Sequence, residues 1–503
     1  PPPTSTLFPY TTLFRSTNYF ERLNYHVQRG FSGDDALGFV KNYAKEYYLI
    51  DYYYRKFTTV YLRSFNGNDD WDLLAKLVEN SYNNIYQDKL TQGFSNKLKK
   101  LDGMWIGSHR NTWLKIKNTE HRLYFIISDA LRYELAAEIK EELDRGLRGT
   151  TQLDFMISEL PSVTRVGMAC LLPHRELKFE NDGSILVDGR LSDSTEKRNT
   201  ILHTMKNDAK ACTFDEINGL TKSEFSQFVA PFKIIYIYHN TIDKIGESDG
   251  HKVFSACEQA KDEILGFVKK LINYSASSIA ITSDHGFLYR RNKMEEKDKS
   301  VLPPDTIESS RRYAVTKTDP NGEYTLTFKM LGQDGLYVTT PFGDNCFKTQ
   351  GGGINFMHGG SSLQEITVPY LTLYNARSRD ESLRPQKVGL QLKTTTSILT
   401  SRITKIEFVQ TEPVKDKVIP LNVQIYFEDK LKNRISNVCT IMADSEEEAL
   451  ENRIFSEKFT LKDQHYDRNE EYFLVVEDID EKVNKSVLRM KFKIDLVVQN
   501  QWF

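Results

Sequence analysis

Four side chains that could bind a metal ion follow three apolar segments of the chain. Asp129 comes directly after "RLYFIIS", Asp243 lies four residues after "FKIIYIYH", and Asp284 ends "SIAITSD" with His285 behind it. Carboxylates that meet in one place repel each other by several kcal/mol at low effective dielectric unless a cation compensates them. Carboxylate together with imidazole is a ligand set typical of divalent metals.

Each aspartate also has a simpler interpretation. An aspartate after a strand often caps the next helix, so Asp129 taken alone is more often a cap than a ligand. The metal hypothesis therefore depends on a fold that brings the three segment ends together. Three carboxylates and a histidine at one place are harder to explain as separate caps.

The segments themselves predict such a fold. "LRYELAAEIKEELDR" and "SACEQAKDEILGFVKKLINY" have apolar residues at helical spacing and alternate with the apolar segments. Unbroken apolar strands between helices are typical of a parallel sheet that is covered by helices on both faces. Ligands bind to such sheets just beyond the carboxyl ends of the strands. The sequence therefore predicts an α/β core with the four polar residues at one sheet edge.

The rest of the chain divides by pattern. Residues 17–118 are rich in tyrosine and have helical spacing, which predicts a helical region without clustered polar chemistry. Residues 119–375 contain the α/β core, within which residues 174–230 have a polar, helical pattern. Residues 376–503 contain seven segments that alternate in period two, which predicts an antiparallel β-sandwich. We expect this domain either to bind a partner or only to cover part of the core.

Composition excludes several classes. Lys and Arg number 67 against 69 Asp and Glu, so the net charge gives no general attraction to nucleic acid or anionic membrane. The five cysteines lack CxxC spacing, which favours reduced thiols and a cytoplasmic protein over a zinc ribbon or disulfide framework. No apolar run is long enough for a membrane span, so no membrane partner is expected. "TLFPYTTLFRS", Thr6–Ser16, reads as a translated sequencing adapter, so residues 1–16 are expected to be an artefact.

Five motifs, in this order, resemble the PglZ family of the alkaline phosphatase superfamily, and its type A form in particular. They are "ISDALRYE", "LPSVTRVGM", "YHNTIDKIGE", "ITSDHGFLY" and "MHGGSSLQEITVP". The resemblance spans residues 122–374, about half of the chain. It implies an alkaline phosphatase-like fold and a bacterial phosphatase of BREX antiviral defence. It further implies a phosphate ester substrate, which includes nucleotides and nucleic acids, and other BREX defence proteins as partners.

The resemblance also implies two divalent metal ions, with zinc preferred and manganese or magnesium as alternatives. Asp129, Asp284 and His285 match the ligands of the first metal. Thr164, in "PSVTRVG", matches a nucleophile that binds the same metal. A metal lowers the pKa of a bound hydroxyl, so that an otherwise poor threonine nucleophile can attack phosphorus.

The second metal site departs from the superfamily pattern. Asp243 and His358 match two of its ligands, but Glu247 stands where a histidine is usual. A carboxylate makes this site richer in oxygen, which favours Mn²⁺ or Mg²⁺ beside Zn²⁺. His239 could serve as a substitute ligand, or it could be a strand-end histidine bonded to the backbone.

Two further interpretations concern the substrate. Arg165 follows the predicted nucleophile and could contact a phosphate in bidentate fashion, although a solvated arginine is the simpler interpretation. Two classes of function stay open: a phosphomonoesterase or phosphodiesterase that uses Thr164, and a defence-complex scaffold that binds a nucleotide without turnover. Glu247 is the feature that keeps the second class open.

Overall fold

A computed structural model gives the structure of the chain. It describes residues 8–64, 69–147, 149–180, 183–291, 294–320, 322, 324–330, 333, 335–349, 355–375, 385–415, 417–481 and 486–496. The chain forms two compact units. The first unit comprises Pro1–Leu143 and Thr150–Arg377, and the second comprises Asp144–Gly149 and Ser378–Phe503. The sequence boundary predicted at residue 376 and the first seven of the sixteen residues predicted as an adapter artefact lie outside the described residues.

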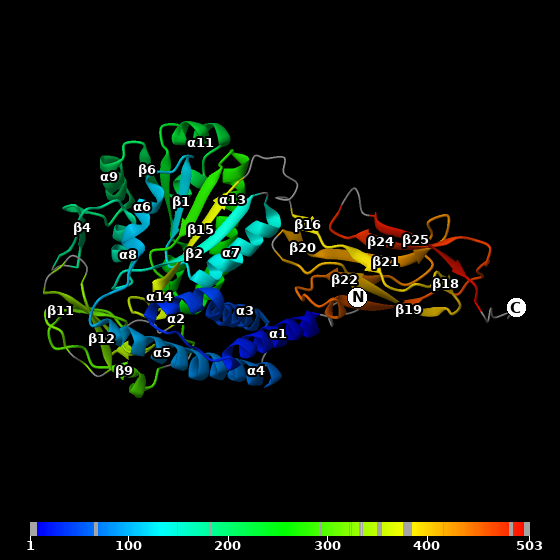
Figure 1. Cartoon of the computed structure of the whole chain (residues 1–503), viewed down its shortest axis with the longest axis horizontal. Coiled ribbons are helices and arrows are strands. Elements are labelled where there is room, and N and C mark those ends of the chain that lie inside the picture. The colour runs from blue at the N-terminus through cyan, green and yellow to red at the C-terminus, as the bar shows by residue number, and fades with distance from the viewer. Residues whose placement is uncertain are drawn as a thin grey trace, which may run out of the picture. The chain divides into compact units, whose positions relative to one another are not determined.

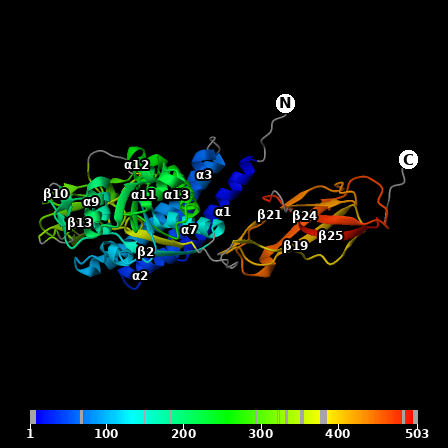
Figure 2. The same ribbon diagram turned by 90° about the horizontal axis from the view of Figure 1, so that it is seen from above.

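The first unit is built on a six-stranded sheet (Figures 1 and 2). Its strands lie in the order β2 (Thr150–Ile157), β15 (Thr367–Tyr374), β8 (Ser278–Thr282), β1 (Leu123–Ser128), β7 (Ile234–His239) and β6 (Ala209–Thr213). Strands β8, β1, β7 and β6 are parallel, whereas β15 is antiparallel to both β8 and β2. The central strand β1 is buried along its whole length. This explains its unbroken apolar sequence, since both of its faces contact other side chains.

Helices cover both faces of this sheet. In Figure 1, α8 and α9 lie on one side of the strands, and α7 and α13 lie on the other. The helices that follow the first strand are α7 (Tyr133–Gly146), α8 (Thr164–Leu171), α9 (Thr195–Met205), α10 (Phe214–Asn218), α11 (Lys222–Val229), α12 (Thr241–Ser248), α13 (Val253–Asn273) and α14 (Leu363–Ile366). The predicted α/β core is therefore confirmed, with one strand reversed.

The helical pattern of residues 174–230 describes only part of this segment. Besides α9, α10 and α11, this segment holds a small sheet of β3 (Leu177–Phe179), β4 (Ile185–Val187) and β5 (Arg190–Leu191), together with edge strand β6. These strands have two to five residues. Runs this short are too brief for a period-two pattern to stand out from the flanking helices.

Short strands between the third core strand and β15 form a second small sheet in the order β10 (Thr306–Ser309), β11 (Ala314–Thr316), β13 (Tyr337–Pro341) and β12 (Thr325–Lys329). A further pair joins β9 (Lys299–Ser300) to β14 (Cys346–Phe347).

The helical region precedes the core. It consists of α1 (Phe8–Gln28), α2 (Ala36–Asn42), α3 (Tyr48–Ser64), α4 (Asp69–Glu79), α5 (Asp88–Leu98) and α6 (Thr112–Ile116), with π-helical turns at Tyr43–Tyr47 and Asn80–Gln87. Asp35 caps α2 through Gly38 N at 2.7 Å. This region and the core belong to the same compact unit.

A buried carboxylate of the helical region holds the loop after β1. Arg132, three residues after Asp129, places its Nη2 2.8 Å from Asp51 Oδ1. The same carboxylate accepts hydrogen bonds from the hydroxyls of Tyr82 at 2.5 Å, Tyr43 at 2.8 Å and Tyr86 at 3.0 Å. Asp51 is fully buried and Arg132 nearly so. Such a pair is tolerated in a core because every charge has close partners.

A second buried network joins α3 to two core helices. Arg55 of α3 is fully buried and donates two hydrogen bonds of 3.0 Å to Glu134 of α7. It also forms ion pairs with Glu138 of α7 and Glu258 of α13. Lys261 adds contacts of 3.1 Å to Glu138 and 3.2 Å to Glu258. These charges fix the helical region to the core at a point that no sequence pattern indicates.

The second unit is a β-sandwich, as predicted. One sheet has the order β18 (Ile398–Leu399), β25 (Ser486–Ile494), β24 (Tyr472–Asp478), β21 (Leu421–Glu428) and β22 (Cys439–Ala443), and the other has β17 (Leu390–Leu392), β19 (Ile403–Gln410) and β23 (Ile454–Thr460). Both sheets contribute to one core, which includes Phe408, Phe427, Phe459 and Phe492. The long strands pair antiparallel, and short parallel pairs join β16 (Gln386–Lys387) to β20 (Val418–Ile419) and β18 to β25.

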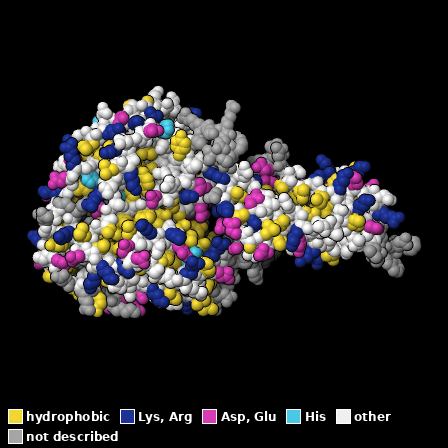
Figure 3. All heavy atoms as spheres, in the orientation of Figure 1, with side chains coloured by type: hydrophobic (Ala, Val, Ile, Leu, Met, Phe, Trp, Pro, Cys, Tyr) yellow, Lys and Arg dark blue, Asp and Glu magenta, His cyan; other side chains and the backbone are white. Residues whose placement is uncertain are grey.

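The distribution of surface charge and the state of the cysteines agree with what the composition predicts. Basic and acidic side chains are interspersed on the face shown in Figure 3. All five cysteines are free and buried. Among the described helices, none has the length and apolar character needed to cross a membrane.

Candidate functional site

Three parallel strands bring the predicted metal ligands to one edge of the sheet. Strand β1 pairs with β7 so that Ser128 lies opposite His239, and it pairs with β8 so that Ile127 lies opposite Thr282. The residues that follow these strands therefore leave the sheet at the same level. This is the edge at which parallel sheets bind ligands.

The first cluster consists of Asp129, Asp284 and His285, whose ligand atoms all lie within 4.8 Å of one another. His285 Nε2 is 3.6 Å from Asp129 Oδ1 and 3.4 Å from Asp284 Oδ2. The other ring nitrogen, Nδ1, is 2.9 Å from the Gly286 carbonyl oxygen, to which only a protonated nitrogen can donate. This bond fixes the tautomer, so Nε2 faces the carboxylates with a free lone pair.

Thr164 lies against this cluster at the first position of α8. Its Oγ1 is 3.1 Å from His285 Nε2 and 3.5 Å from Asp129 Oδ1. The preceding residue, Val163, provides no side-chain cap, so the first amide groups of α8 remain free to bind an anion. Helix α8 approaches closely because residue 167 is glycine, where a Cβ would lie 2.4 Å from the Asp284 carbonyl oxygen.

The second cluster consists of Asp243, His358 and again His285. His358 Nε2 lies 4.0 Å from Asp243 Oδ1. The rings of His285 and His358 stack with centroids 4.4 Å apart and planes 8° apart. The loop that carries His358 is tied to the nucleophile loop, because Ser162 Oγ donates to the Gly360 carbonyl at 2.7 Å. The two clusters therefore share one histidine and adjoin one another.

Glu247 lies outside this second cluster. It is exposed on α12, one helical turn after Asp243. Its charge nevertheless contributes to raising the pKa of Asp243, after the larger effect of burial. A second metal would thus find Asp243 and the histidines in place, whereas Glu247 would have to turn toward it.

The ligand atoms fit divalent cations. Asp284 Oδ2, Asp243 Oδ1 and His358 Nδ1 are buried, and each lacks a hydrogen-bond partner among the described residues. Burial and neighbouring carboxylates raise the pKa of Asp129 well above its usual value, and burial raises that of Asp284. Burial lowers the pKa of His285 and of His358 to about 4, so both imidazoles are neutral at pH 7. Crowded carboxylates beside neutral imidazoles are stabilised by cations.

This crowding predicts a pH effect on the metal-free protein. Burial, Glu247 and Asp284 raise the pKa of Asp243 to about 8, against 3.8 for the ordinary group. Between pH 6.5 and 8 the unfolded chain has lost this proton and the folded chain retains it, so stability falls as pH rises. His285 and His358 are neutral in the folded state over this range, whereas the unfolded chain loses their protons around the ordinary pKa of 6.5, so they contribute a slope of the opposite sign that is common to both proteins. We expect the Tm of the wild type, minus that of Asp243→Asn, to decrease from pH 6.5 to pH 8.

The measurement is thermal unfolding of both proteins in a chelating buffer. The subtraction removes the titration of groups whose pKa Asp243 does not influence, and added Zn²⁺ or Mn²⁺ should remove the part of the wild-type pH dependence that comes from Asp243. A Tm difference that stays constant over this pH range would contradict the expected titration.

Two other predicted residues are engaged elsewhere. Arg165 forms an ion pair with Glu308 and donates to the Tyr313 hydroxyl at 3.2 Å. His239 uses both ring nitrogens, with Nδ1 2.9 Å from Ser128 Oγ and Nε2 2.8 Å from Glu263 Oε2. A phosphate contact by Arg165 or a metal contact by His239 would require these bonds to be exchanged.

A further residue at the site escaped the sequence argument. His109 is fully buried, and its Nε2 is 2.9 Å from the carbonyl oxygen of Ser283, the residue before Asp284. It comes from the end of the helical region, far along the chain from the ligands. A lone histidine in a segment without a motif gives no signal that it supports the metal loop.

A pocket of about 650 Å³ opens beside the site. Asp129 and Thr164 form part of its wall, together with Arg198, Tyr238 and Lys244. A substrate attacked by Thr164 could therefore extend into it.

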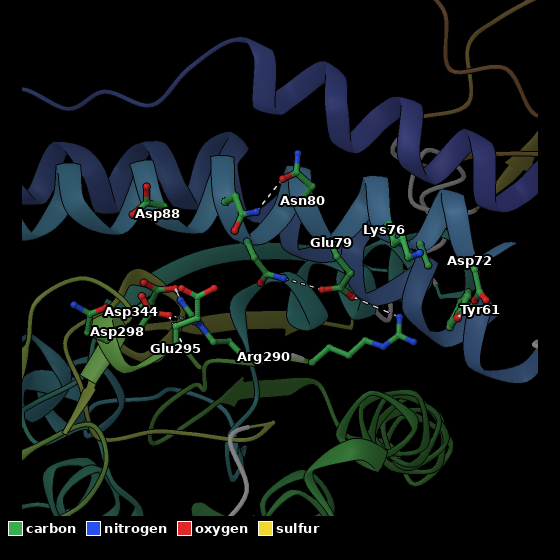
Figure 4. A pocket seen from close by; sticks show the side chains of 15 residues that line it. Tyr61, Asp72, Lys76, Glu79, Asn80, Asp88, Arg290, Glu295, Asp298 and Asp344 are labelled. Carbon is green, nitrogen blue, oxygen red and sulfur yellow. Dashed lines mark hydrogen bonds and ion pairs between the residues drawn. The ribbon is translucent and has the colours of Figure 1, made fainter. Parts of the chain in front are cut away.

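A larger pocket of about 810 Å³ lies between the helical region and the segment that follows the metal ligands. Figure 4 shows Arg290 in this pocket beside Asp298 and Asp344, with both of which it forms ion pairs. Glu79 accepts hydrogen bonds from Tyr54 and Asn83 and lies 3.7 Å from Arg291. These charged groups therefore have partners of opposite charge. The contact between Glu79 and Arg291 joins the helical region to the core.

Comparison with known families gives a match over the core. The model of the BREX system PglZ alkaline phosphatase-like domain matches residues 112–373. The alkaline phosphatase-like protein PglZ of Bacillus cereus (strain H3081.97) is 35% identical over 497 residues, which are 95% of this chain and 58% of that protein. The alkaline phosphatase-like protein BrxZ of Escherichia coli O9:H4 (strain HS) is 29% identical over 501 residues, covering 94% and 57%. The chain thus spans less than three fifths of these relatives.

Solved structures show weaker likenesses. Murine ectonucleotide pyrophosphatase / phosphodiesterase 5 matches with a TM-score of 0.34 and 10% identity, over 50% of this chain and 87% of that one. Phosphonoacetate hydrolase from Sinorhizobium meliloti 1021 in complex with phosphonoformate matches with a TM-score of 0.33 and 11% identity, over 50% and 90%.

Proposed function

The chain belongs to the PglZ family of BREX alkaline phosphatase-like proteins, and we propose that it is a metal-dependent phosphohydrolase with Thr164 as the nucleophile. One observation carries this proposal. The Thr164 hydroxyl lies at the start of α8, within 3.5 Å of both Asp129 and His285, next to two clusters of metal-ligand groups. A nucleophile, its activating site and a phosphate-binding helix start therefore meet at one sheet edge.

The metals have defined places in this proposal. Asp129, Asp284 and His285 would hold the first, and Asp243 and His358 the second, with Glu247 able to turn toward it. When bound, two divalent ions, with zinc preferred to manganese or magnesium, lower the pKa of a coordinated hydroxyl and offset charge on a phosphate.

The chain's own residues account for the remaining steps. Thr164 Oγ1 attacks phosphorus and forms a phosphothreonine, while the free amide groups of α8 orient the phosphate oxygens. The bond from phosphorus to the ester oxygen breaks, and the departing alcohol takes up the proton that the threonine hydroxyl loses. His285 is held by the Gly286 carbonyl, so its Nε2 stays aimed at the hydroxyl. Water then hydrolyses the phosphothreonine and restores the threonine. The substrate is a phosphate monoester or diester.

Replacement of Thr164 by alanine tests the proposal. We expect hydrolysis of p-nitrophenyl phosphate or bis(p-nitrophenyl) phosphate, with Zn²⁺, Mn²⁺ or Mg²⁺, to fall by at least about 10³-fold, since loss of a nucleophile removes the whole covalent route. Thr200→Ala is a matched control, because Thr200 is an exposed threonine of α9. Turnover that survives in Thr164→Ala but requires metal would disprove the assignment of the nucleophile.

A second candidate function is a scaffold that binds a nucleotide without turnover. The exposure of Glu247 favours it, because the second site then has fewer ligands in place. Binding of two metal ions without hydrolysis of any tested substrate would support this alternative.

Partners are proposed from the relatives alone. Two curated relatives carry the names PglZ and BrxZ, so we propose that this chain associates with other BREX proteins and acts on a nucleotide or nucleic acid. The β-sandwich is the part available for such contacts, since no catalytic cluster lies among its described residues.

A further inference from the structure

We propose that the pocket beside Thr164 binds a phosphoryl leaving group, so that phosphoric anhydrides are the preferred substrates. The inference rests on the proposed function, because it concerns the group that departs when Thr164 attacks. Thr164 and Asp129 form part of the wall of this 650 Å³ pocket, and so do an arginine and a lysine.

Arg198 is held in place as a binding residue would be. It is 9% exposed, its Nε donates to the Ser192 carbonyl at 2.7 Å, and its guanidinium lies 4.8 Å from the centre of the Tyr238 ring. These contacts fix the plane of the guanidinium. Neither contact satisfies its two terminal amino groups, which are the part of an arginine that grips phosphate oxygens.

Tyr238 adds a second polar group, next to Arg198. Its side chain is 8% exposed, and its hydroxyl is buried without a hydrogen-bond partner among the described residues. A buried hydroxyl that lines a pocket and lacks a partner costs free energy unless a ligand supplies one.

The carboxylates that line the pocket are Asp129, which belongs to the first metal cluster, and three others that are engaged elsewhere. Asp193 is 2.9 Å from Lys197, and Glu263 is 2.8 Å from His239 and accepts from Thr241 at 2.6 Å. Asp215 lies in the first turn of α10, where the helix N-terminus stabilises a carboxylate. Arg198 and Lys244, in contrast, form no ion pair among the residues described, although the charge of Arg198 acts on Asp129 and favours the ionised carboxylate there.

Two helix N-termini also face the pocket. Helices α9 and α12 begin at Thr195 and Thr241, and both residues line the pocket. The positive ends of two helix dipoles therefore face the same space as Arg198 and Lys244. A neutral alcohol as leaving group would use none of these four features, whereas a phosphoryl group would use all of them.

The reaction balances without a further reagent. Thr164 Oγ1 forms a bond to the attacked phosphorus, and the bond from that phosphorus to the bridging oxygen breaks. The departing group keeps the bridging oxygen and its electron pair, and so leaves as a phosphate, which takes up the proton that the threonine hydroxyl loses. Water then cleaves the phosphothreonine, so one water molecule is consumed for each anhydride bond.

The test compares two kinds of substrate in the full chain with added Zn²⁺ or Mn²⁺. ATP and inorganic pyrophosphate carry phosphoryl leaving groups, and bis(p-nitrophenyl) phosphate does not. We expect Arg198→Met to lower kcat/KM for the anhydrides by about 10- to 100-fold, the effect of losing a hydrogen bond to a charged group. Hydrolysis of the diester should change by less than about threefold, and Arg198→Lys should retain part of the anhydride activity.

Arg190→Met is the matched control, because Arg190 is an exposed arginine of β5 bonded to Thr204 Oγ1 at 2.8 Å. Binding of pyrophosphate to Thr164→Ala protein, measured by calorimetry, gives a readout that does not need turnover. Arg198→Met added to that protein should weaken this binding about tenfold or more.

The outcomes separate the two proposals. Diester hydrolysis without anhydride hydrolysis, or equal losses on both in Arg198→Met, would overturn this inference and leave the proposed function standing. Failure to hydrolyse any substrate would overturn the proposed function, and the pyrophosphate titration would then decide the pocket alone. A preference for ATP over pyrophosphate would show that the wider pocket also contacts a nucleoside.

Discussion

Replacement of Asp129 by asparagine should abolish metal-dependent hydrolysis and leave the protein folded. The partners of Asp129 are His285 at 3.6 Å and Thr164 at 3.5 Å, and helix α7 begins only at Tyr133. We expect turnover to fall by more than about 100-fold, because even groups that merely orient metal ligands are worth 10- to 100-fold. An asparagine would preserve much of a capping interaction, so a cap and a ligand give opposite results.

Stability should respond in the other direction. Burial, with the charges of Asp284 and Asp243, raises the pKa of Asp129, so its ionised form destabilises the metal-free fold. The metal-free variant should therefore unfold at a Tm no lower than the wild type at pH 8, and it should lose the Tm increase that Zn²⁺ or Mn²⁺ gives the wild type. Asp188→Asn, in an exposed turn where Asp188 accepts from Arg175 N and Glu176 N, is the control. Full activity in Asp129→Asn would exclude a ligand role.

Replacement of Arg55 by methionine should destabilise the first unit by about 3–5 kcal/mol, the usual cost of removing one partner from a buried ionic network. Glu134 is fully buried and has Arg55 as its ion-pair partner, whereas Glu138, nearly buried, also keeps Lys56 and Lys261. Methionine fills similar volume, so the loss would come from the uncompensated carboxylates. Chemical denaturation of wild type and variant gives the difference directly.

A double variant sharpens this test. Arg55→Met with Glu134→Gln removes the cation and one buried anion together, and we expect it to be more stable than Arg55→Met alone. Lys252→Met is a matched control, since Lys252 pairs with Asp249 on the surface and such pairs contribute about 1 kcal/mol or less. A loss for Arg55→Met as small as that control would show that the network contributes little.

The sequence predicted the centre of the fold better than its margins. Strands β1, β7 and β8 are long apolar runs because both faces of the sheet are covered there. Strands β2 and β6 were missed, and both lie at the edges of the sheet. In β2 exposed and half-exposed residues alternate over the first six positions, so no apolar run marks it. The antiparallel direction of β15 was not predicted either, because the residues of a strand do not indicate the direction in which it runs.

In the candidate site, too, the residues that follow central strands were predicted, whereas those that depend on distant contacts were not. Asp129, Asp284 and His285 follow predicted strands, so parallel strand ends alone place them together. Arg198, His109 and the Arg165–Glu308 pair depend on contacts between distant segments, which spacing along the chain cannot reveal. Whether the assembled residues act as assigned stays a prediction for the experiments above.

The cluster of three tyrosines around Asp51 has a consequence for the minimal folding unit. The family match starts at residue 112, after α5, yet Arg132 in the loop beside Asp129 has its carboxylate partner on α3. A protein shortened to residues 112–373 would lose Asp51 and Arg55, the ion-pair partners of Arg132 and Glu134, and would expose the core surface that α3 covers. The segment that defines the family is thus shorter than the segment that can fold, and truncations for expression should retain α3, α4 and α5.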